Sequence, residues 1–192
     1  PTEIFGLPIT HYAHQADIIR LQALIEEGGV YADIDSIFLN KFPEEFYKKH
    51  FVMGQQGNEG LCNALMMSSK ESPFAMKWLS DHKMCFKGGA PGTDGWCTHS
   101  VYHPLRLSRE IPEHIHIAGP KAFFGSLYHQ GDLYNFFKQE TPPDFSPTLL
   151  GSEYYSFHLW ENVSWNDYLK NLTEQKIFAE NNLYNSIARL HI

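Results

Sequence analysis

The stretch Gly28-Gly29-Val30-Tyr31-Ala32-Asp33-Ile34-Asp35 decides the fold of this chain. Residues 15–27, which precede it, carry apolar side chains at helical spacing, so a helix is expected to end at the glycine pair. Val30-Tyr31-Ala32 is short, apolar and rich in strand-forming residues. The stretch therefore predicts a helix, then a strand, then two carboxylates where the strand ends.

Outward from this stretch, helical and strand patterns alternate. Strands are expected at residues 37–39, 51–53, 63–67, 114–118 and 154–160. Helices are expected at residues 73–82, at 98–107 with an interruption at Pro104, and at 166–192, while 87–95 and 142–147 are expected to be loops. The order predicts an α/β fold with a mixed central sheet in a single domain over residues 1–192.

Composition excludes several classes of protein. A formal charge of −7 without any cluster of Lys and Arg argues against a nucleic-acid partner, because a phosphate backbone demands clustered positive charge. No apolar run approaches the ~20 residues that span a bilayer. The chain is expected to be a soluble domain, cytoplasmic or Golgi-luminal, since it opens at Pro1 and an anchor could lie upstream.

Asp33 and Asp35 are the first candidate ligands. Two carboxylates one residue apart on an extended strand end point the same way, with Ile34 expected to pack on the other side. Hard oxygen ligands suit Mg²⁺ or Mn²⁺, and substrate phosphates commonly complete the coordination of such ions. The other interpretations are a simple turn, or a phosphate-cleaving metalloenzyme, for which the sequence lacks the further Asp and His clusters that a second ion needs.

The wider context resembles a known signature. The run Ala16-Asp17-Ile18-Ile19-Arg20, Leu24 and then residues 28–35 is similar to the DXD-motif glycosyltransferase family, which includes initiating α-1,6-mannosyltransferases, α-1,4-galactosyltransferases and the catalytic domains of glucosylating toxins. The likeness continues through Asn63-Ala64, Gly119-Pro120 and the segment from Phe157 to Trp165. It implies a GT-A fold and a retaining transfer of a hexose from a nucleotide sugar, such as a UDP- or GDP-hexose, to a glycan or protein acceptor.

The resemblance also implies roles for individual residues. Asp33 and Asp35 would bind Mn²⁺ or Mg²⁺, with His158 as a further ligand from the C-terminal segment. Arg20 would stabilise the departing diphosphate, and Asp94 falls where relatives carry polar residues near the transferred sugar. The remaining residues would contact the donor or close over it: Asp17, Asn63, Ala64, Trp160 and Trp165.

Each residue also has a purely structural interpretation. Asp17 and Arg20 could be an i, i+3 helix ion pair, His158 a core histidine, and the two tryptophans core residues. Asn63 could be a turn or strand-end residue, and Asp94 a turn residue. The remaining histidines, His99 among them, show no spacing that assigns them a function.

One departure from the family concerns the start of the chain. Relatives carry βα units before the Asp-Arg helix that hold the nucleobase, whereas here only residues 1–15 precede Ala16. The chain is therefore expected to lack these units or to be the C-terminal part of a longer domain. The alternative function is a sugar-nucleotide or glycan-binding module without catalysis.

Overall fold

The computed structural model describes residues 1–89, 93 and 95–192. The fold divides into two units, and each is described by itself. Unit 1 consists of Pro1–Asp33 and Phe42–Gly119, and unit 2 of Ile34–Lys41 and Pro120–Ile192. The chain passes from unit 1 to unit 2 between the two carboxylates of the Asp33-Ile34-Asp35 triplet. The single domain over residues 1–192 stays a prediction.

Unit 1 is built on a four-stranded mixed sheet with the order β3-β6-β5-β7. The strands are β3 Gly29–Ala32, β5 Phe51–Gln56, β6 Gly60–Ser68 and β7 His116–Ala118, and a separate hairpin pairs β1 Glu3–Ile4 with β2 Leu7–Pro8. Neighbours β3, β6 and β5 are antiparallel, while β7 runs parallel to β5. The predicted mixed sheet in an α/β chain is confirmed.

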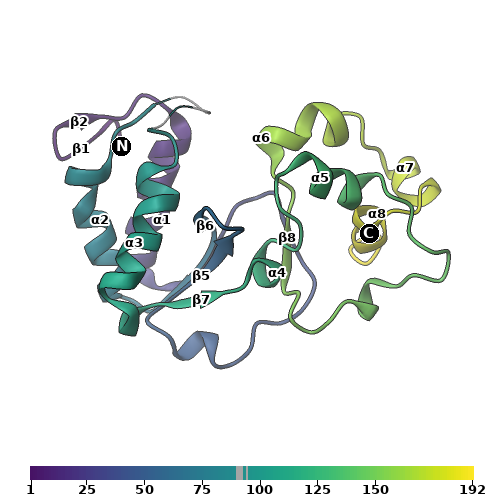
Figure 1. The fold of residues 1–192 in the computed structure, drawn as a ribbon, viewed down its shortest axis with the longest axis horizontal. Helices are drawn as coiled ribbons and strands as arrows, with labels where there is room; N and C mark the ends of the chain where they lie inside the picture. Colours follow the sequence, from purple (N-terminus) through teal and green to yellow (C-terminus); the bar gives the residue numbers. More distant parts are fainter. Residues whose placement is uncertain (90–92, 94) are drawn as a thin grey trace. The chain divides into compact units, whose positions relative to one another are not determined.

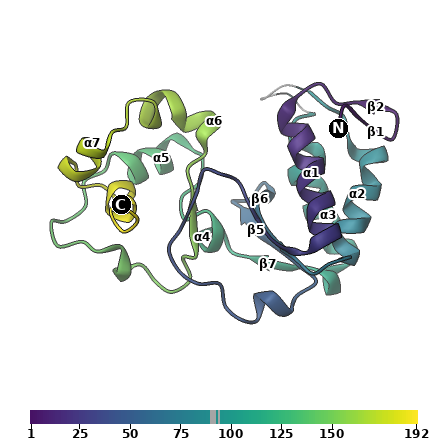
Figure 2. The ribbon, with the colours of Figure 1, turned by 180° about the vertical axis from the view of Figure 1, so that it is seen from behind.

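Three helices lie side by side over one face of this sheet (Figures 1 and 2). They are α1 Tyr12–Glu27, α2 Pro73–Cys85 and α3 His103–Glu110. The core between them and the sheet is apolar and fully buried: Leu21, Leu24, Phe51, Met53, Leu61, Met66, Phe74, Ala75, Trp78 and Leu107. Helix α1 runs along the sheet and is followed directly by β3, as the sequence predicts.

The segment before α3 corrects one expectation. Pro104 does not interrupt a helix, because it lies in the first turn of α3, where the missing N–H costs no intrahelical bond. A π-helical turn, Thr98–Tyr102, runs directly into α3. Single-turn 3₁₀ helices complete the regular structure of both units: Phe46–Lys48, Pro112–His114 and Pro147–Leu149.

Unit 2 is organised around a two-stranded antiparallel sheet. Strand β4 Ser36–Phe38 pairs with β8 Ser156–His158, with Ser36 opposite His158. Short helices surround it: α4 Pro120–Phe123, α5 Gln130–Phe137, α6 Glu161–Ser164, α7 Glu174–Ala179 and α8 Leu183–Ala188. Stacked aromatic rings form the core, with Phe136 parallel to Phe157 at 5.2 Å between ring centroids.

The prediction of one long helix over residues 166–192 is wrong. The segment forms a π-helical turn, Trp165–Leu169, followed by the two short helices α7 and α8. Each short helix has its own polar start, because the side chains of Thr173 and Asn182 accept hydrogen bonds from the backbone N–H groups of Lys176 and Asn185.

Among the described residues no helix is long and apolar enough to cross a membrane.

Candidate functional site

Unit 1 holds a buried polar network at the end of β3. Its members come from three elements: Asp17 and Arg20 from α1, Asp33 just after β3, and Asn63 from β6. Asp17 and Arg20 lie one helical turn apart and face the sheet, with relative exposures of 9% and 6%. We refer to these four residues as the Asp17–Arg20 network.

Arg20 joins the members of the network. Its Nη1 lies 3.2 Å from Asp33 Oδ1 and donates to the backbone carbonyl of Asn63 at 2.8 Å. Its guanidinium carbon lies 4.6 Å from the centre of the Tyr31 ring, a cation–π contact. The i, i+3 ion pair with Asp17 is present, with Nη2 3.7 Å from Asp17 Oδ1, but it is buried and is one of several contacts of this side chain.

Asp17 is held through both of its oxygens. Asn63 Nδ2 donates to Oδ1 at 2.7 Å, and His99 Nε2 lies 3.0 Å from Oδ2. Burial alone would raise the pKa of Asp17, but the hydrogen bond from His99 and the charge of Arg20 outweigh it, so the pKa lies below its ordinary value. The carboxylate is therefore charged although it is buried.

Asp33 is oriented from its own strand. The Tyr31 hydroxyl donates to Asp33 Oδ1 at 2.6 Å, and the Asp33 backbone N–H donates to the carbonyl of Ala64 at 2.7 Å. Burial raises the pKa of Tyr31, and the hydrogen bond to Asp33 raises it further against the effect of Arg20. Ala64 itself is buried in β6 next to Asn63.

Unit 2 holds the second carboxylate of the triplet together with His158. Because Ser36 pairs with His158 across the β4–β8 sheet, Asp35 lies beside the histidine. His158 Nε2 is 3.0 Å from Asp35 Oδ1, and the Glu161 backbone N–H donates to Oδ2 at 2.9 Å. Burial raises the pKa of Asp35, but the hydrogen bond and charge of His158 lower it more, so the net shift is downward.

The two tryptophans of the C-terminal segment differ in burial. Trp160 is 9% exposed, has a left-handed backbone with φ of 54°, and donates from its indole N–H to the Ser126 carbonyl at 2.9 Å. Its ring meets the His158 ring edge-on at 4.4 Å between centroids. Trp165 is 46% exposed, so its ring is available to a ligand.

Two expectations about the candidate residues need comment. Asp33 directly follows the end of β3, as expected, while Ile34 and Asp35 form a turn before β4; Ile34 is fully exposed, so no packed apolar side directs the carboxylates. Backbone pairing and side-chain hydrogen bonds fix them instead. Asp94 lies outside the described residues.

His99 is a member of the site that sequence reasoning missed. It is completely buried and hydrogen-bonds Asp17, which is 82 positions away in the chain. No local pattern can report such a contact. From the sequence, His99 belongs to the helix expected at 98–107 and has no assigned function.

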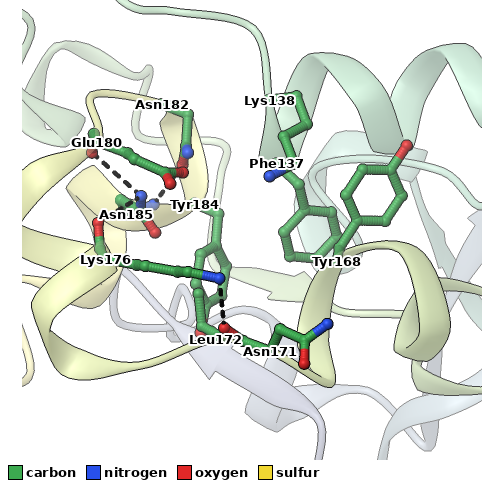
Figure 3. A pocket seen from close by; sticks show the side chains of 10 residues that line it. All are labelled: Phe137, Lys138, Tyr168, Asn171, Leu172, Lys176, Glu180, Asn182, Tyr184 and Asn185. Carbon is green, nitrogen blue, oxygen red and sulfur yellow. Dashed lines mark hydrogen bonds between the residues drawn. The ribbon is translucent and has the colours of Figure 1, made fainter.

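Two hollows, one in each unit, lie away from these residues. Figure 3 shows a hollow in unit 2, where Lys176 Nζ donates to the Asn171 carbonyl at 2.8 Å. Its volume of about 30 Å³ admits a water molecule and no sugar. A hollow of about 350 Å³ in unit 1 lies between Cys85 and Arg106, away from the Asp17–Arg20 network.

Comparisons with known proteins bear on the region that contains these side chains. A family model described as "Glycosyltransferase sugar-binding region containing DXD motif" matches residues 4–53. The chain is 33% identical over 199 aligned positions to "Glucan organizing enzyme 1" of Cryptococcus neoformans var. grubii, covering 98% of this chain and 51% of that protein. Residues 4–53 are thus similar to the DXD-containing sugar-binding region of glycosyltransferases.

Further matches of the chain are shorter. "Subversion of eukaryotic traffic protein A" of Legionella pneumophila is 36% identical over 64 residues, covering 31% of this chain and 10% of that protein. Among solved structures, "PaToxG Glycosyltransferase" has 24% identity and a TM-score of 0.39 over 53% of this chain and 37% of that chain. The chain spans about half the length of Glucan organizing enzyme 1. The resemblance stated from the sequence is confirmed, and Asp33-Ile34-Asp35 is the DXD triplet of the matched region.

Proposed function

We propose that this chain is the donor-binding part of a metal-dependent, retaining glycosyltransferase of the GT-A type. It would move a hexose from a nucleotide sugar to a glycan or protein acceptor. The observation that supports this most is the Asp17–Arg20 network, because one buried arginine connects the first DXD carboxylate to the backbone carbonyl of Asn63. A helix-surface ion pair would not require such a set of interlocked contacts.

The donor atoms fit a hard divalent cation. Asp33 and Asp35 keep part of their carboxylates accessible, with side-chain exposures of 27% and 18%. His158 adds an imidazole nitrogen beside Asp35, and carboxylate with imidazole suits Mn²⁺ or Mg²⁺. When bound, the ion would neutralise charge on the donor diphosphate.

The protein residues would act by binding and positioning. Arg20 would hold Asp33 and Asn63 in place and contribute positive charge where the leaving diphosphate becomes negative. Asp17 and Asn63 would bind sugar hydroxyls next to Ala64, with Asp94 near the transferred sugar. Trp160 and Trp165 would belong to a segment that closes over the donor. The acceptor hydroxyl would attack on the face from which the diphosphate leaves, so no strong protein base is needed.

Isothermal titration of UDP- and GDP-hexoses, with and without Mn²⁺, tests the proposal. We expect Mn²⁺-dependent binding that Asp33→Asn and Asp35→Asn each abolish, while the matched control Asp144→Asn, which changes an exposed carboxylate, binds as the parent does. A donor at about one hundred times its Kd should also add about 2.7 kcal/mol to the free energy of unfolding. Unchanged Mn²⁺-dependent binding in both triplet variants would contradict the proposal.

A further inference from the structure

A cluster of buried histidines in unit 1 has unpaired ring nitrogens. Among the described residues, His14 Nε2, His82 Nε2 and His99 Nδ1 have no hydrogen-bond partner. The three residues are 2%, 0% and 0% exposed, and their rings contact one another through His99. Native interiors rarely leave neighbouring polar atoms unpaired, which singles out this region of unit 1, although His82 and His99 Nδ1 are not among the ligand atoms proposed below.

The fold brings a carboxylate to the same place. His14 and Asp17 lie one turn apart on α1, and His99 comes from the π-helical turn Thr98–Tyr102, a kind of turn that is frequent at functional sites. One ligand atom from each of the three lies within 4.8 Å of the others. His99 Nε2 lies 3.0 Å from Asp17 Oδ2, a separation close to that of two ligands on one ion.

We propose that His14, Asp17 and His99 bind a divalent transition-metal ion, with Zn²⁺ the best match. Two imidazoles and one carboxylate are the ligand set of three-ligand zinc sites, in which a water completes the coordination. The site uses Asp17 Oδ2, whereas Asn63 and Arg20 contact Oδ1. The ion would join α1 to the turn that precedes α3.

Outer contacts that hold metal ligands in place are present. Asn63 Nδ2 fixes the Asp17 carboxylate at 2.7 Å, so Oδ2 faces His99. The Trp78 indole N–H donates to the His99 carbonyl at 2.7 Å, and the Phe86 ring packs edge-on against the His99 ring at 4.9 Å between centroids. Such partners orient ligands before the ion arrives. The inferred site shares Asp17 and Asn63 with the proposed donor site, but it needs neither Asp33 nor Asp35, so metal binding is measurable apart from donor binding.

The test measures metal content and affinity without any sugar nucleotide. The purified protein is stripped with a chelator, dialysed against Zn²⁺ and analysed by mass spectrometry for bound metal, and its affinity is titrated. We expect one Zn²⁺ per chain, and more than about 100-fold weaker binding in His14→Gln and His99→Gln, since even the loss of an outer partner costs about 10–100-fold. The control His50→Gln changes an exposed histidine and should bind as the parent does.

Two further measurements establish which residues bind the ion. An Asp33→Asn, Asp35→Asn double variant should retain the Zn²⁺, whereas its loss there would assign the ion to the DXD carboxylates and overturn the proposal. Co²⁺ loaded into the unmodified protein should give the intense visible absorption of a four-coordinate site, which avoids reliance on variants that fail to fold. The proposal would be overturned if the unmodified protein took up neither Zn²⁺ nor Co²⁺, or if the His14 and His99 variants took up as much metal as the unmodified protein.

Discussion

Arg20 carries the largest share of the contacts in the polar network of unit 1. Its side chain is 7% exposed and its nitrogens reach Asp33, the Asn63 carbonyl and the Ala16 carbonyl. Lysine keeps the charge but has one nitrogen on a flexible stem, so it cannot satisfy these acceptors together. Burial therefore makes the residue important for stability as well as for the donor binding that we propose.

The first prediction at this scale concerns Arg20→Lys. We expect the free energy of unfolding to fall by about 1–3 kcal/mol, the cost of leaving buried hydrogen-bond partners unsatisfied, and Mn²⁺-dependent donor binding to weaken. Urea denaturation followed by circular dichroism measures the first effect and isothermal titration the second. Arg109→Lys, at an exposed position of α3, is the matched control and should change neither. If Arg20→Lys were as stable as the parent, the single ammonium group of lysine would be enough to hold the network together.

Residue identities in the site were predictable where they follow from the triplet and its flanking helix. Asp17, Arg20 and Asp33 come together because a helix that ends at Gly28 and a strand that follows it must lie side by side. The partner of Asp17 in the third dimension was not predictable, since His99 approaches from a turn 82 positions away. Tertiary packing decides such contacts, and spacing in the sequence does not carry them.

Gly28 shows how one element sets the position of the next. Its φ of 70° lies in the left-handed region, and its backbone N–H donates to the Leu24 carbonyl at 3.0 Å to end α1. A Cβ at this position would lie 2.7 Å from the backbone nitrogen of Lys70. Glycine is thus required both for the turn and for the close approach of the chain that follows β6.

The second prediction compares Gly28→Ala with Gly29→Ala. Both positions have positive φ, of 70° and 97°, but a Cβ at Gly29 meets nothing within 4 Å. We expect each substitution to cost about 1–3 kcal/mol for backbone strain, and Gly28→Ala to cost a further ~1–3 kcal/mol for the overlap. Chemical denaturation of the two variants side by side measures the difference. Equal losses would show that the Lys70 backbone yields without cost.

Elements with strong local signals were predictable and the C-terminal region was not. Helix α2 begins with Ser72 as its cap and Pro73 in its first turn, as the sequence indicates. Residues 166–192 offer apolar side chains at helical spacing, yet Thr173 and Asn182 start new helices there. A polar side chain that caps a new helix competes with continuation of the preceding one, and the spacing of apolar residues alone does not predict where this happens.

At the scale of the whole molecule, each of the two units is made of two separate segments of the chain. Unit 1 takes the N-terminal segment and the central sheet, and unit 2 takes β4 from the segment directly after the first DXD carboxylate. The α/β class and the mixed sheet followed from the order of apolar segments. The division did not, because it depends on β4 pairing with β8 across more than half of the chain.

Buried histidines make the stability of unit 1 sensitive to acid, and His103 in α3 shows why. It is 3% exposed, its Nε2 lies 3.1 Å from Asp81 Oδ2, and Arg106 lies 3.1 Å from its Nδ1. Burial lowers the pKa of His103 below its ordinary value, and the opposing effect of Asp81 is not sufficient to reverse this. Arg106 only donates, so Nδ1 accepts and the ring is neutral in the folded protein.

The last prediction follows from this neutral ring. Below about pH 6.5 the unfolded chain binds a proton at His103 more readily than the folded chain, so the free energy of unfolding is highest above that pH and falls as the pH drops. Urea denaturation at about pH 7.5 and about pH 5.5 should show a larger loss in the parent than in His103→Gln, whose amide takes up no proton in this range. His129→Gln, at an exposed position of unit 2, should lose as much as the parent. If His103→Gln lost as much stability as the parent, the His103 ring would have to accept its proton inside the folded protein, with the Asp81 carboxylate compensating for burial.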